Sequence, residues 1–260
     1  MKNGFFIFLA AFLALGGSWL GFVLGPVHQL GGAQQTTVLN STDTYPLQRT
    51  GDATLGLQVY RANGCAACHT ESVRQTGMAC NVVLTEAGKN PQAVTNLVLS
   101  LTLSKLTREA ADKITDQIIA AGGKAEVHIA ATGPDMARGW GMRQSVAEDY
   151  LYDQPVQLGS LRAGPDLSNI GVRAPDANWQ LTHLYAPAAV MKGSTMPPFR
   201  YLFELRKLGL TPSPDALQFP KEFVLPAGYE VVPTPEGREL AAYLLSLRAN
   251  APLYSAPISP

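Results

Sequence analysis

Residues 63–75 read NGCAACHTESVRQ and place two cysteines three positions apart, with a histidine directly after the second. Thiols at positions i and i+3 lie on the same side of a helical turn, where both can form thioether bonds to one porphyrin. An imidazole at the next position can then ligate the iron of that porphyrin. The sequence therefore predicts one covalently attached haem c, held by Cys65 and Cys68, with His69 as the proximal ligand.

A zinc site and a redox-active dithiol are the two alternative uses of this motif. A zinc site needs a second ligand pair, such as another CxxC or an HxxxH, and the sequence contains neither. A thioredoxin-type dithiol is expected after a βα unit and does not need the histidine. The third cysteine, Cys80, is predicted to be an unpaired cysteine in a strand rather than a reactive thiol, and three cysteines do not make a disulfide scaffold.

A second axial ligand decides what such a haem can do. Met196 is favoured, because Pro197 and Pro198 in the segment KGSTMPPF restrict the backbone and hold the thioether on a stiff support. Soft sulfur favours ferrous iron and raises the reduction potential, as in electron carriers with Met/His ligation. The alternatives are Met191, which ranks next, followed by Met136, Met142, Met78, His128 and His183. Of these, His183 is expected to be a hydrogen-bonded structural histidine.

The segment GSLRAGPDLSNIGVR, residues 159–173, carries the other residues that can serve a haem. Its Gly-Pro pair predicts a tight loop that lacks one N–H group. A ligating histidine needs an acceptor for its second ring nitrogen, and we expect the carbonyl of Pro165 to accept from His69 Nδ1. Arg162 and Arg173 are either partners of the haem propionates, since a planar cation suits a carboxylate, or ordinary surface arginines.

The N-terminal segment GFFIFLAAFLALGGSWLGFVLG, residues 4–25, contains no charged residue. At about 1.5 Å per residue it spans roughly 30 Å, the thickness of the hydrocarbon core of a bilayer. A cleaved signal peptide ending at Ala33 is the alternative, but the apolar run is longer than the roughly 7–15 residues of a signal peptide. We therefore expect an uncleaved single-pass anchor. Lys2 and the amino terminus favour an inside N-terminus, which leaves everything after residue 25 outside.

Composition narrows the possible partners. The 260 residues suffice for one large or two small domains, and 20 Lys and Arg balance 20 Asp and Glu. No basic run is present, so nucleic acid is not an expected partner. Only 15% of residues are charged, whereas Gly and Pro number 24 and 19, which indicates a folded, loop-rich protein with short elements.

Two predicted helices flank the rest of the chain after the anchor. Residues 52–64 predict a helix with Leu55, Val59 and Tyr60 on one side, leading into the cysteine motif. The segment TPEGRELAAYLLSLRAN predicts a second helix with Thr234 as N-cap and Pro235 in its first turn. The apolar stripe of that helix is formed by Leu240, Tyr243, Leu244 and Leu247. Such a pair suggests the packed helices of a cytochrome c domain.

Residues 80–131 have a sequence pattern that differs from that of the segments on either side. Residues 80–88 are typical of a strand, and residues 91–121 are typical of helical structure. The sequence KAEVHIAAT that follows has the residue alternation of a strand. Two strands separated by helices can pair in parallel through crossovers, which predicts a small α/β module. The stretches VVLTEAGKN and AAGGKAEVHI are similar to the C-terminal domain of the bacterial ribosomal stalk protein. That resemblance implies a fold and no ribosomal function.

The expected architecture is therefore mainly α, with an N-terminal transmembrane helix and a helical haem domain interrupted by a small α/β insertion. The expected segments are a cytoplasmic stub and anchor (1–25), a linker (26–50), a cytochrome c domain (51–79 and 132–250), the inserted module (80–131) and a tail (251–260).

Several stretches in this order resemble the mono-haem cytochrome c subunit, the FixO/CcoO family, of cbb-type haem-copper cytochrome c oxidases. They are the anchor, GLQVYRANGCAACHTESVR, RGWGMRQSVAEDYLYDQPVQLGSLRAGPDLSNIGVR, NWQLTHLYAP and STMPPF. The resemblance implies that His69 and Met196 are the axial ligands. It also implies a bacterial inner-membrane protein whose periplasmic domain lies beside the haem-copper catalytic subunit and other cytochrome c subunits.

The sequence departs from this family in two places. The α/β module intervenes between the haem motif and the RGWG segment, and the C-terminal part resembles small cytochromes c in general. The expected role is a non-catalytic electron-transfer subunit, because His/Met-ligated iron has no open position. The alternatives are the cytochrome c subunit of a nitric oxide reductase, a free-standing membrane cytochrome, a five-coordinate haem c sensor or enzyme, and a docking protein centred on the module.

Overall fold

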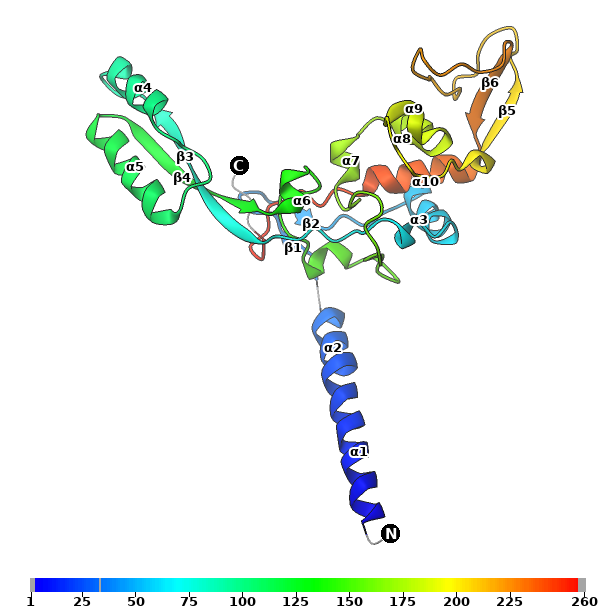
Figure 1. The fold of residues 1–260 in the computed structure, drawn as a ribbon, viewed down its shortest axis with the longest axis horizontal. Coiled ribbons are helices and arrows are strands. Elements are labelled where there is room, and N and C mark those ends of the chain that lie inside the picture. Colours follow the sequence, from blue (N-terminus) through cyan, green and yellow to red (C-terminus); the bar gives the residue numbers. More distant parts are fainter. Residues whose placement is uncertain (1–2, 33, 257–260) are drawn as a thin grey trace.

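The structure is a computed structural model that describes residues 3–32 and 34–256. An isolated N-terminal helix, a helical domain and a small module that projects from it make up the molecule (Figure 1). Most regular structure is helical, and three two-stranded sheets complete it, so the predicted mainly α fold class is confirmed. The predictions that involve Lys2 and Ala33 lie outside the described residues.

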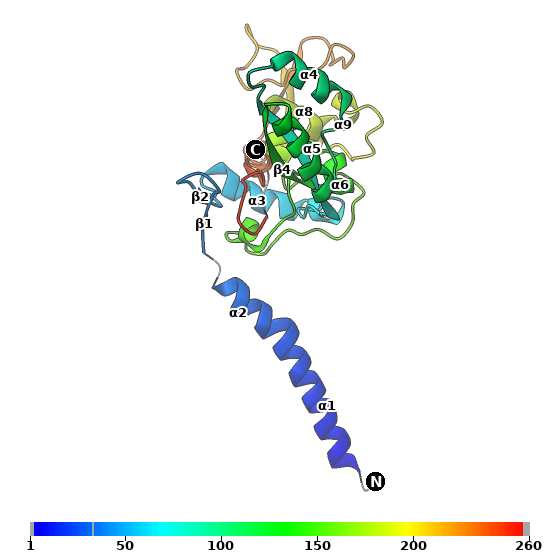
Figure 2. The same ribbon diagram turned by 90° about the vertical axis from the view of Figure 1, so that its left-hand side faces the viewer.

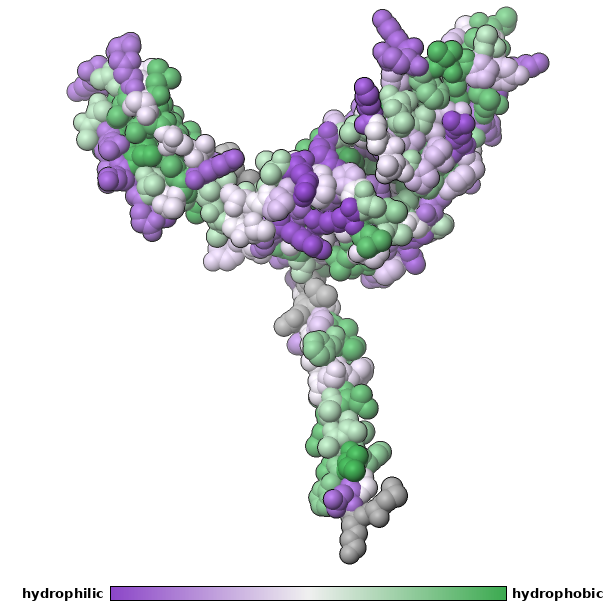
Figure 3. Space-filling view, in the orientation of Figure 1, coloured by the Kyte–Doolittle hydropathy of each residue, from purple (hydrophilic) through white to green (hydrophobic). Residues whose placement is uncertain are grey.

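The N-terminal helix is continuous but changes its winding. It consists of α1 (Gly4–Trp19), a π-helical turn (Leu20–Leu24) and α2 (Gly25–Gly31). The wider turn comes just before Pro26, whose missing N–H and bulky ring disturb an ordinary α-turn. The helix thus continues beyond residue 25, where the apolar run ends. Gly4–His28 is long and apolar enough to cross a membrane, and Figure 3 shows apolar residues along most of its length.

The predicted helix pair forms the centre of the helical domain. Helix α3 (Asp52–Ala62) packs against α10 (Pro235–Ser246), and the ring centroids of Tyr60 and Tyr243 lie 5.1 Å apart. The helices approach closely at Gly56, where a Cβ atom would lie 1.9 Å from the carbonyl oxygen of Glu239. The contact is therefore centred on Gly56 and Tyr60. Leu55, predicted to face the core, is exposed because the glycine side of α3 makes the contact.

The start of α10 follows the prediction in detail. The Thr234 hydroxyl accepts a hydrogen bond from Gly237 N, which makes it the N-cap, and Pro235 occupies the first turn. The predicted stripe is buried, at Leu240, Tyr243, Leu244 and Leu247. This stripe packs into one core cluster with Leu167, Leu184, Tyr185 and Phe203, which come from the segments between the module and α10.

Short elements complete the helical domain. They are β1 (Thr36–Thr37), β2 (Thr44–Tyr45), a 3-10 turn (Cys65–Ala67), α6 (Pro134–Ala137), a 3-10 turn (Ala147–Tyr150), α7 (Ile170–Arg173), α8 (Ala177–Tyr185), α9 (Pro187–Val190), a 3-10 turn (Arg200–Leu202), β5 (Phe203–Lys207) and β6 (Tyr229–Pro233). β1 pairs with β2 and β5 with β6, each pair antiparallel. The β5–β6 hairpin has no counterpart among the predicted elements, and it projects away from the module (Figure 1).

The projecting module contains β3 (Gly77–Glu86), α4 (Pro91–Ser100), α5 (Arg108–Ala120) and β4 (Lys124–Thr132). Its strands are antiparallel, with Gly77 opposite Thr132, so the expectation of parallel pairing is wrong. Parallel pairing would require the connection to bring the chain back to the start of β3. Here two helices connect the strands, and β4 begins beside the end of β3 instead. The module has its own core cluster, formed by Cys80, Val82, Val94, Ala111 and Ile118. In Figure 2 the module lies in front of the helical domain.

Candidate haem site

The cysteine motif forms one tight turn at the end of α3. Gly64 adopts a left-handed conformation, and the N–H groups of Cys68 and His69 donate to the carbonyl of Cys65 at 3.1 and 3.0 Å. A 3-10 turn has about three residues per turn, which places positions i and i+3 on one side. Cys65 and Cys68 indeed line the same cavity. Burial raises the pKa of the Cys65 thiol to about 12, so this sulfur is in an apolar setting that suits a thioether.

The cavity measures about 680 Å³, a size typical of cofactor sites. Its walls come from α3, the cysteine motif, residues 138–140, residues 163–174, α8, residues 191–197 and α10. Arginine and lysine side chains are among the lining residues, whereas no aspartate or glutamate is. A cavity of this composition favours a largely apolar ligand that carries negative charge at its periphery.

The imidazole of His69 is fixed from one side. Its Nδ1 atom lies 2.8 Å from the carbonyl oxygen of Pro165, which is the predicted contact. The ring rests on Gly164, where a Cβ atom would lie 2.2 Å from His69 Cε1. Burial lowers the pKa of His69, although the Pro165 carbonyl opposes the shift, and the neutral ring is the form that binds a metal. The Nε2 atom is thereby left available to an iron.

The loop that carries Pro165 is held against the cysteine motif by backbone hydrogen bonds. Ser160 N donates to Ala66 O at 3.1 Å, and Gly164 N donates to Cys68 O at 2.9 Å. Leu167 N extends the pairing to Thr70 O at 2.7 Å. These bonds place the Pro165 carbonyl independently of the ligand, so the orientation of the His69 ring is built into the fold.

Two buried carboxylates support this arrangement, and neither was identified from the sequence. Asp166 is fully buried and accepts hydrogen bonds from Thr70 Oγ1 at 2.6 Å, Ser72 N at 2.8 Å and Ser168 N at 2.9 Å. The Asp-Leu-Ser sequence is the one available signal, because aspartate often accepts from the N–H two residues later.

The second carboxylate is Glu71, which is 3% exposed and accepts from the hydroxyl of Tyr243 at 3.0 Å. This contact joins α10 to the segment that follows His69. Burial raises the pKa of Glu71 to about 8, even though the Tyr243 hydroxyl and the Arg49 guanidinium oppose the shift. No local sequence pattern indicates such a contact, because its partners lie 172 residues apart.

The structure brings two of the methionine candidates to the cavity. Met196 and Met191 both line it, and Pro197 follows in the same wall. Met196 is half-buried and packs against the core cluster, whereas Met191 is 51% exposed. Met78, Met136 and Met142 are not among the lining residues. Of the two methionines that line the cavity, Met196 is therefore the more buried.

His183 also lines the cavity, on α8. Its ring stacks on that of Trp179, with centroids 4.9 Å apart and an interplanar angle of 5°. Its Nδ1 atom is buried and has no hydrogen-bond partner among the described residues, unlike the hydrogen-bonded histidine that the sequence predicts. Burial, with a smaller contribution from His69, lowers the pKa of His183 to about 4, so the ring beside the cavity is neutral. His128, by contrast, lies on β4 in the module.

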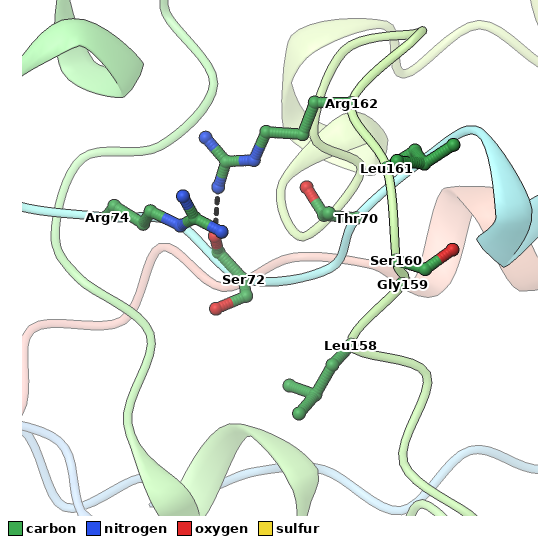
Figure 4. A pocket seen from close by; sticks show the side chains of 8 residues that line it. All are labelled: Thr70, Ser72, Arg74, Leu158, Gly159, Ser160, Leu161 and Arg162. Carbon is green, nitrogen blue, oxygen red and sulfur yellow. Dashed lines mark hydrogen bonds between the residues drawn. The ribbon is translucent and has the colours of Figure 1, made fainter.

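The two arginines of the 159–173 segment, Arg162 and Arg173, lie in different places. Arg173 lines the cavity, donates through Nη2 to Asp166 O at 2.9 Å, and keeps a buried Nη1 with no partner among the described residues. Arg162 is not part of that lining. Its guanidinium donates to both oxygens of Asp135 at 2.7 and 2.8 Å and to Ser72 O at 2.6 Å. Figure 4 shows it in a separate cleft of about 440 Å³, next to Arg74.

These features fit a haem. One histidine nitrogen is satisfied while the other is available, Gly164 leaves room for the ring, and the partnerless Nη1 of Arg173 can meet a carboxylate. Among the described residues, no group of three or more His, Cys, Asp and Glu side chains forms another metal site.

Comparison with known proteins agrees with this assignment. Residues 130–230 match the family model described as cytochrome C oxidase, mono-heme subunit/FixO. The matched region includes the Gly164-Pro165 loop, α8 and Met196, and it begins after the cysteine motif. No curated protein matches the chain. The family match covers 101 of the 260 residues, and over this region the chain is similar to the FixO family of mono-haem cytochrome c oxidase subunits.

Proposed function

We propose that the chain is a membrane-anchored mono-haem cytochrome c that passes electrons to or within a cbb-type haem-copper oxidase. The observation that carries this proposal is the arrangement of two residues around one cavity. His69 has its Nδ1 bound to Pro165, and Met196 lines the same cavity as a half-buried thioether.

A bound haem c supplies a one-electron couple whose potential depends on its axial ligands. Cys65 and Cys68 would hold it covalently, and His69 would ligate through Nε2 while Pro165 fixes the ring. Met196 would supply the sixth ligand. With both axial positions filled by side chains, the site has no position open for oxygen, so reduction of oxygen belongs to another subunit.

The N-terminal helix supports an integral membrane location. Its apolar span, Gly4–His28, leads into a helical domain built of loops and short elements. We propose a single-pass protein of the bacterial inner membrane with the haem domain on the periplasmic side, where haem c is attached to secreted chains. This placement sets the domain beside the catalytic subunit and other cytochrome c subunits of the complex.

Substitution of Met196 tests the electron-transfer role. In the holoprotein, Met196→Ala should abolish the absorption band that reports methionine ligation of ferric haem and should lower the midpoint potential. Met191→Ala is the matched control, because Met191 lines the same cavity but is more exposed. An unchanged band and potential in Met196→Ala would overturn the ligand assignment and reopen the five-coordinate alternative.

Purification in mild detergent tests the partner. Co-purification with a copper-containing integral subunit would support the oxidase. A nitric oxide reductase subunit in its place, or an isolated cytochrome with no partner, would contradict it and support one of the alternatives.

A further inference from the structure

The segment that directly follows the module forms part of the wall of the haem cavity. Strand β4 ends at Thr132, α6 follows, and Arg138 and Trp140 then line the cavity. Helix α6 is fixed at this point by Asp135, which is 2% exposed and accepts from Arg74 N at 2.8 Å as well as from Arg162. The position of Arg138 is therefore set by the contacts of the buried Asp135 in α6.

Two arginines hold the indole of Trp140. The guanidinium carbon of Arg138 lies 5.0 Å from its ring centroid, and that of Arg162 lies 5.6 Å away. Contacts at these distances are attractive cation–π interactions. Arg162 is immobilised by Asp135 and Ser72, so it can fix the indole. Arg138 has no ion pair or side-chain hydrogen bond to any described residue, which leaves its planar fork of donors available.

The charged side chains that line the cavity are all basic. Arg138, Arg173 and Lys192 are among its lining residues, and no lining residue carries a carboxylate. Arg138 is exposed, whereas Arg173 is half-buried and its buried Nη1 has no partner among the described residues, which is unfavourable for a charged group. A haem carries two propionates, so its periphery supplies two carboxylates to a cavity lined by two guanidinium groups, Arg138 and Arg173, that have donors available.

We propose that Arg138 and Arg173 are the two propionate partners of the haem, and that Arg162 acts only through Trp140 and Asp135 as a positioning residue. This inference rests on the proposed function. It reassigns the propionate role predicted for Arg162 to Arg138, a residue that sequence reasoning did not select. It also makes the segment that follows the module, residues 133–140, a structural part of the haem site.

The test uses the full-length holoprotein in detergent and compares Arg138→Gln and Arg173→Gln with the wild type. Loss of a positive charge beside the haem favours the ferric state, so each variant should show a downward shift of the midpoint potential. Redox-difference infrared spectroscopy should show a displaced carboxylate band in both variants. Arg138→Lys, which keeps the charge, should restore most of the potential but not the band position, because lysine lacks the planar fork.

Arg74→Gln is the matched control, since Arg74 is an exposed arginine that lines the separate cleft of Figure 4 and not the haem cavity. It should leave both the potential and the band unchanged. The inference is overturned if Arg138→Gln behaves like Arg74→Gln, or if Lys192→Gln produces the shift in place of Arg138→Gln. If Arg173→Gln does not fold, the exposed Arg138 still decides the result. Wild-type protein without covalent haem would refute the proposed function itself, whereas normal haem with an unresponsive Arg138 refutes only this assignment.

Discussion

The Nδ1 atom of His69 lies 2.8 Å from the carbonyl oxygen of Pro165, a residue 96 positions further along the chain. The whole projecting module lies between these two residues in sequence, yet the contact is made within the helical domain. The fold therefore sets the orientation of the imidazole from a loop that is pinned to the cysteine motif. Under the proposed function, this contact would hold the His69 ring in position for ligation.

Gly164 should tolerate no side chain. A Cβ atom there would lie 2.2 Å from His69 Cε1, so Gly164→Ala should displace the imidazole and reduce the haem bound per polypeptide severalfold. Absorption and electron paramagnetic resonance spectra of the purified protein would measure haem content and axial ligation. Gly209→Ala is the control, because the nearest atom to its Cβ is 3.7 Å away. Equal haem content and identical spectra in the two variants would contradict the geometry described for His69.

Gly56 should be more sensitive to substitution than its apolar neighbour. An alanine there would place Cβ 1.9 Å from Glu239 O and push α3 away from α10. Overpacking of this kind typically lowers the free energy of unfolding by about 1–3 kcal/mol. Leu55→Ala, at a position 45% exposed, should change it by only about 0.5 kcal/mol. Denaturant titration measures both values, and the opposite ranking would mean that the Leu55 side of α3 makes the contact.

The β5–β6 hairpin should lose stability in acid through Glu230. Hydrogen bonds from the Ser213 hydroxyl and N–H, together with Arg206, lower the pKa of Glu230 from 4.5 to about 2. Because the folded state favours the ionised form, this stabilisation is present above pH 4.5 and is lost as the pH falls through about 2. Thermal melting between these pH values should therefore depend less on pH in Glu230→Gln than in the wild type. Glu204→Gln, an exposed change on β5, should follow the wild type, and three identical pH profiles would refute the assignment.

The module should be removable without loss of haem. Its core cluster is separate from that of the helical domain, and the paired residues Gly77 and Thr132 hold its two ends together. A chain in which a short glycine linker replaces residues 80–131 should retain wild-type haem content and midpoint potential. Pyridine haemochrome assay and redox titration measure these quantities. Loss of haem would show that the module is required to form the cavity, whereas slower electron transfer with normal haem would identify it as a docking element.

Local patterns predicted those parts of the molecule that depend on neighbouring residues. The cysteine motif, the N-cap at Thr234 and the strand at residues 124–132 are all of this kind. The Pro165 contact was also foreseeable, because a ligating histidine needs an acceptor and the Gly-Pro loop offers one.

Features that depend on distant contacts could not be predicted in the same way. The antiparallel pairing of β3 and β4 depends on how α4 and α5 pack, and the burial of Glu71 depends on Tyr243 in the last helix. The position of Arg162 has the same origin, because its guanidinium is bound by Asp135 in α6 and does not line the haem cavity.

Covalent attachment at the cysteine motif is the central claim, and mass spectrometry of the peptide that contains Cys65 and Cys68 tests it most directly. After acid–acetone extraction of the purified membrane protein, this peptide should carry the mass of one haem, and the double variant Cys65→Ala/Cys68→Ala should carry none. An unmodified peptide from protein produced with a functional haem c attachment system would contradict the account.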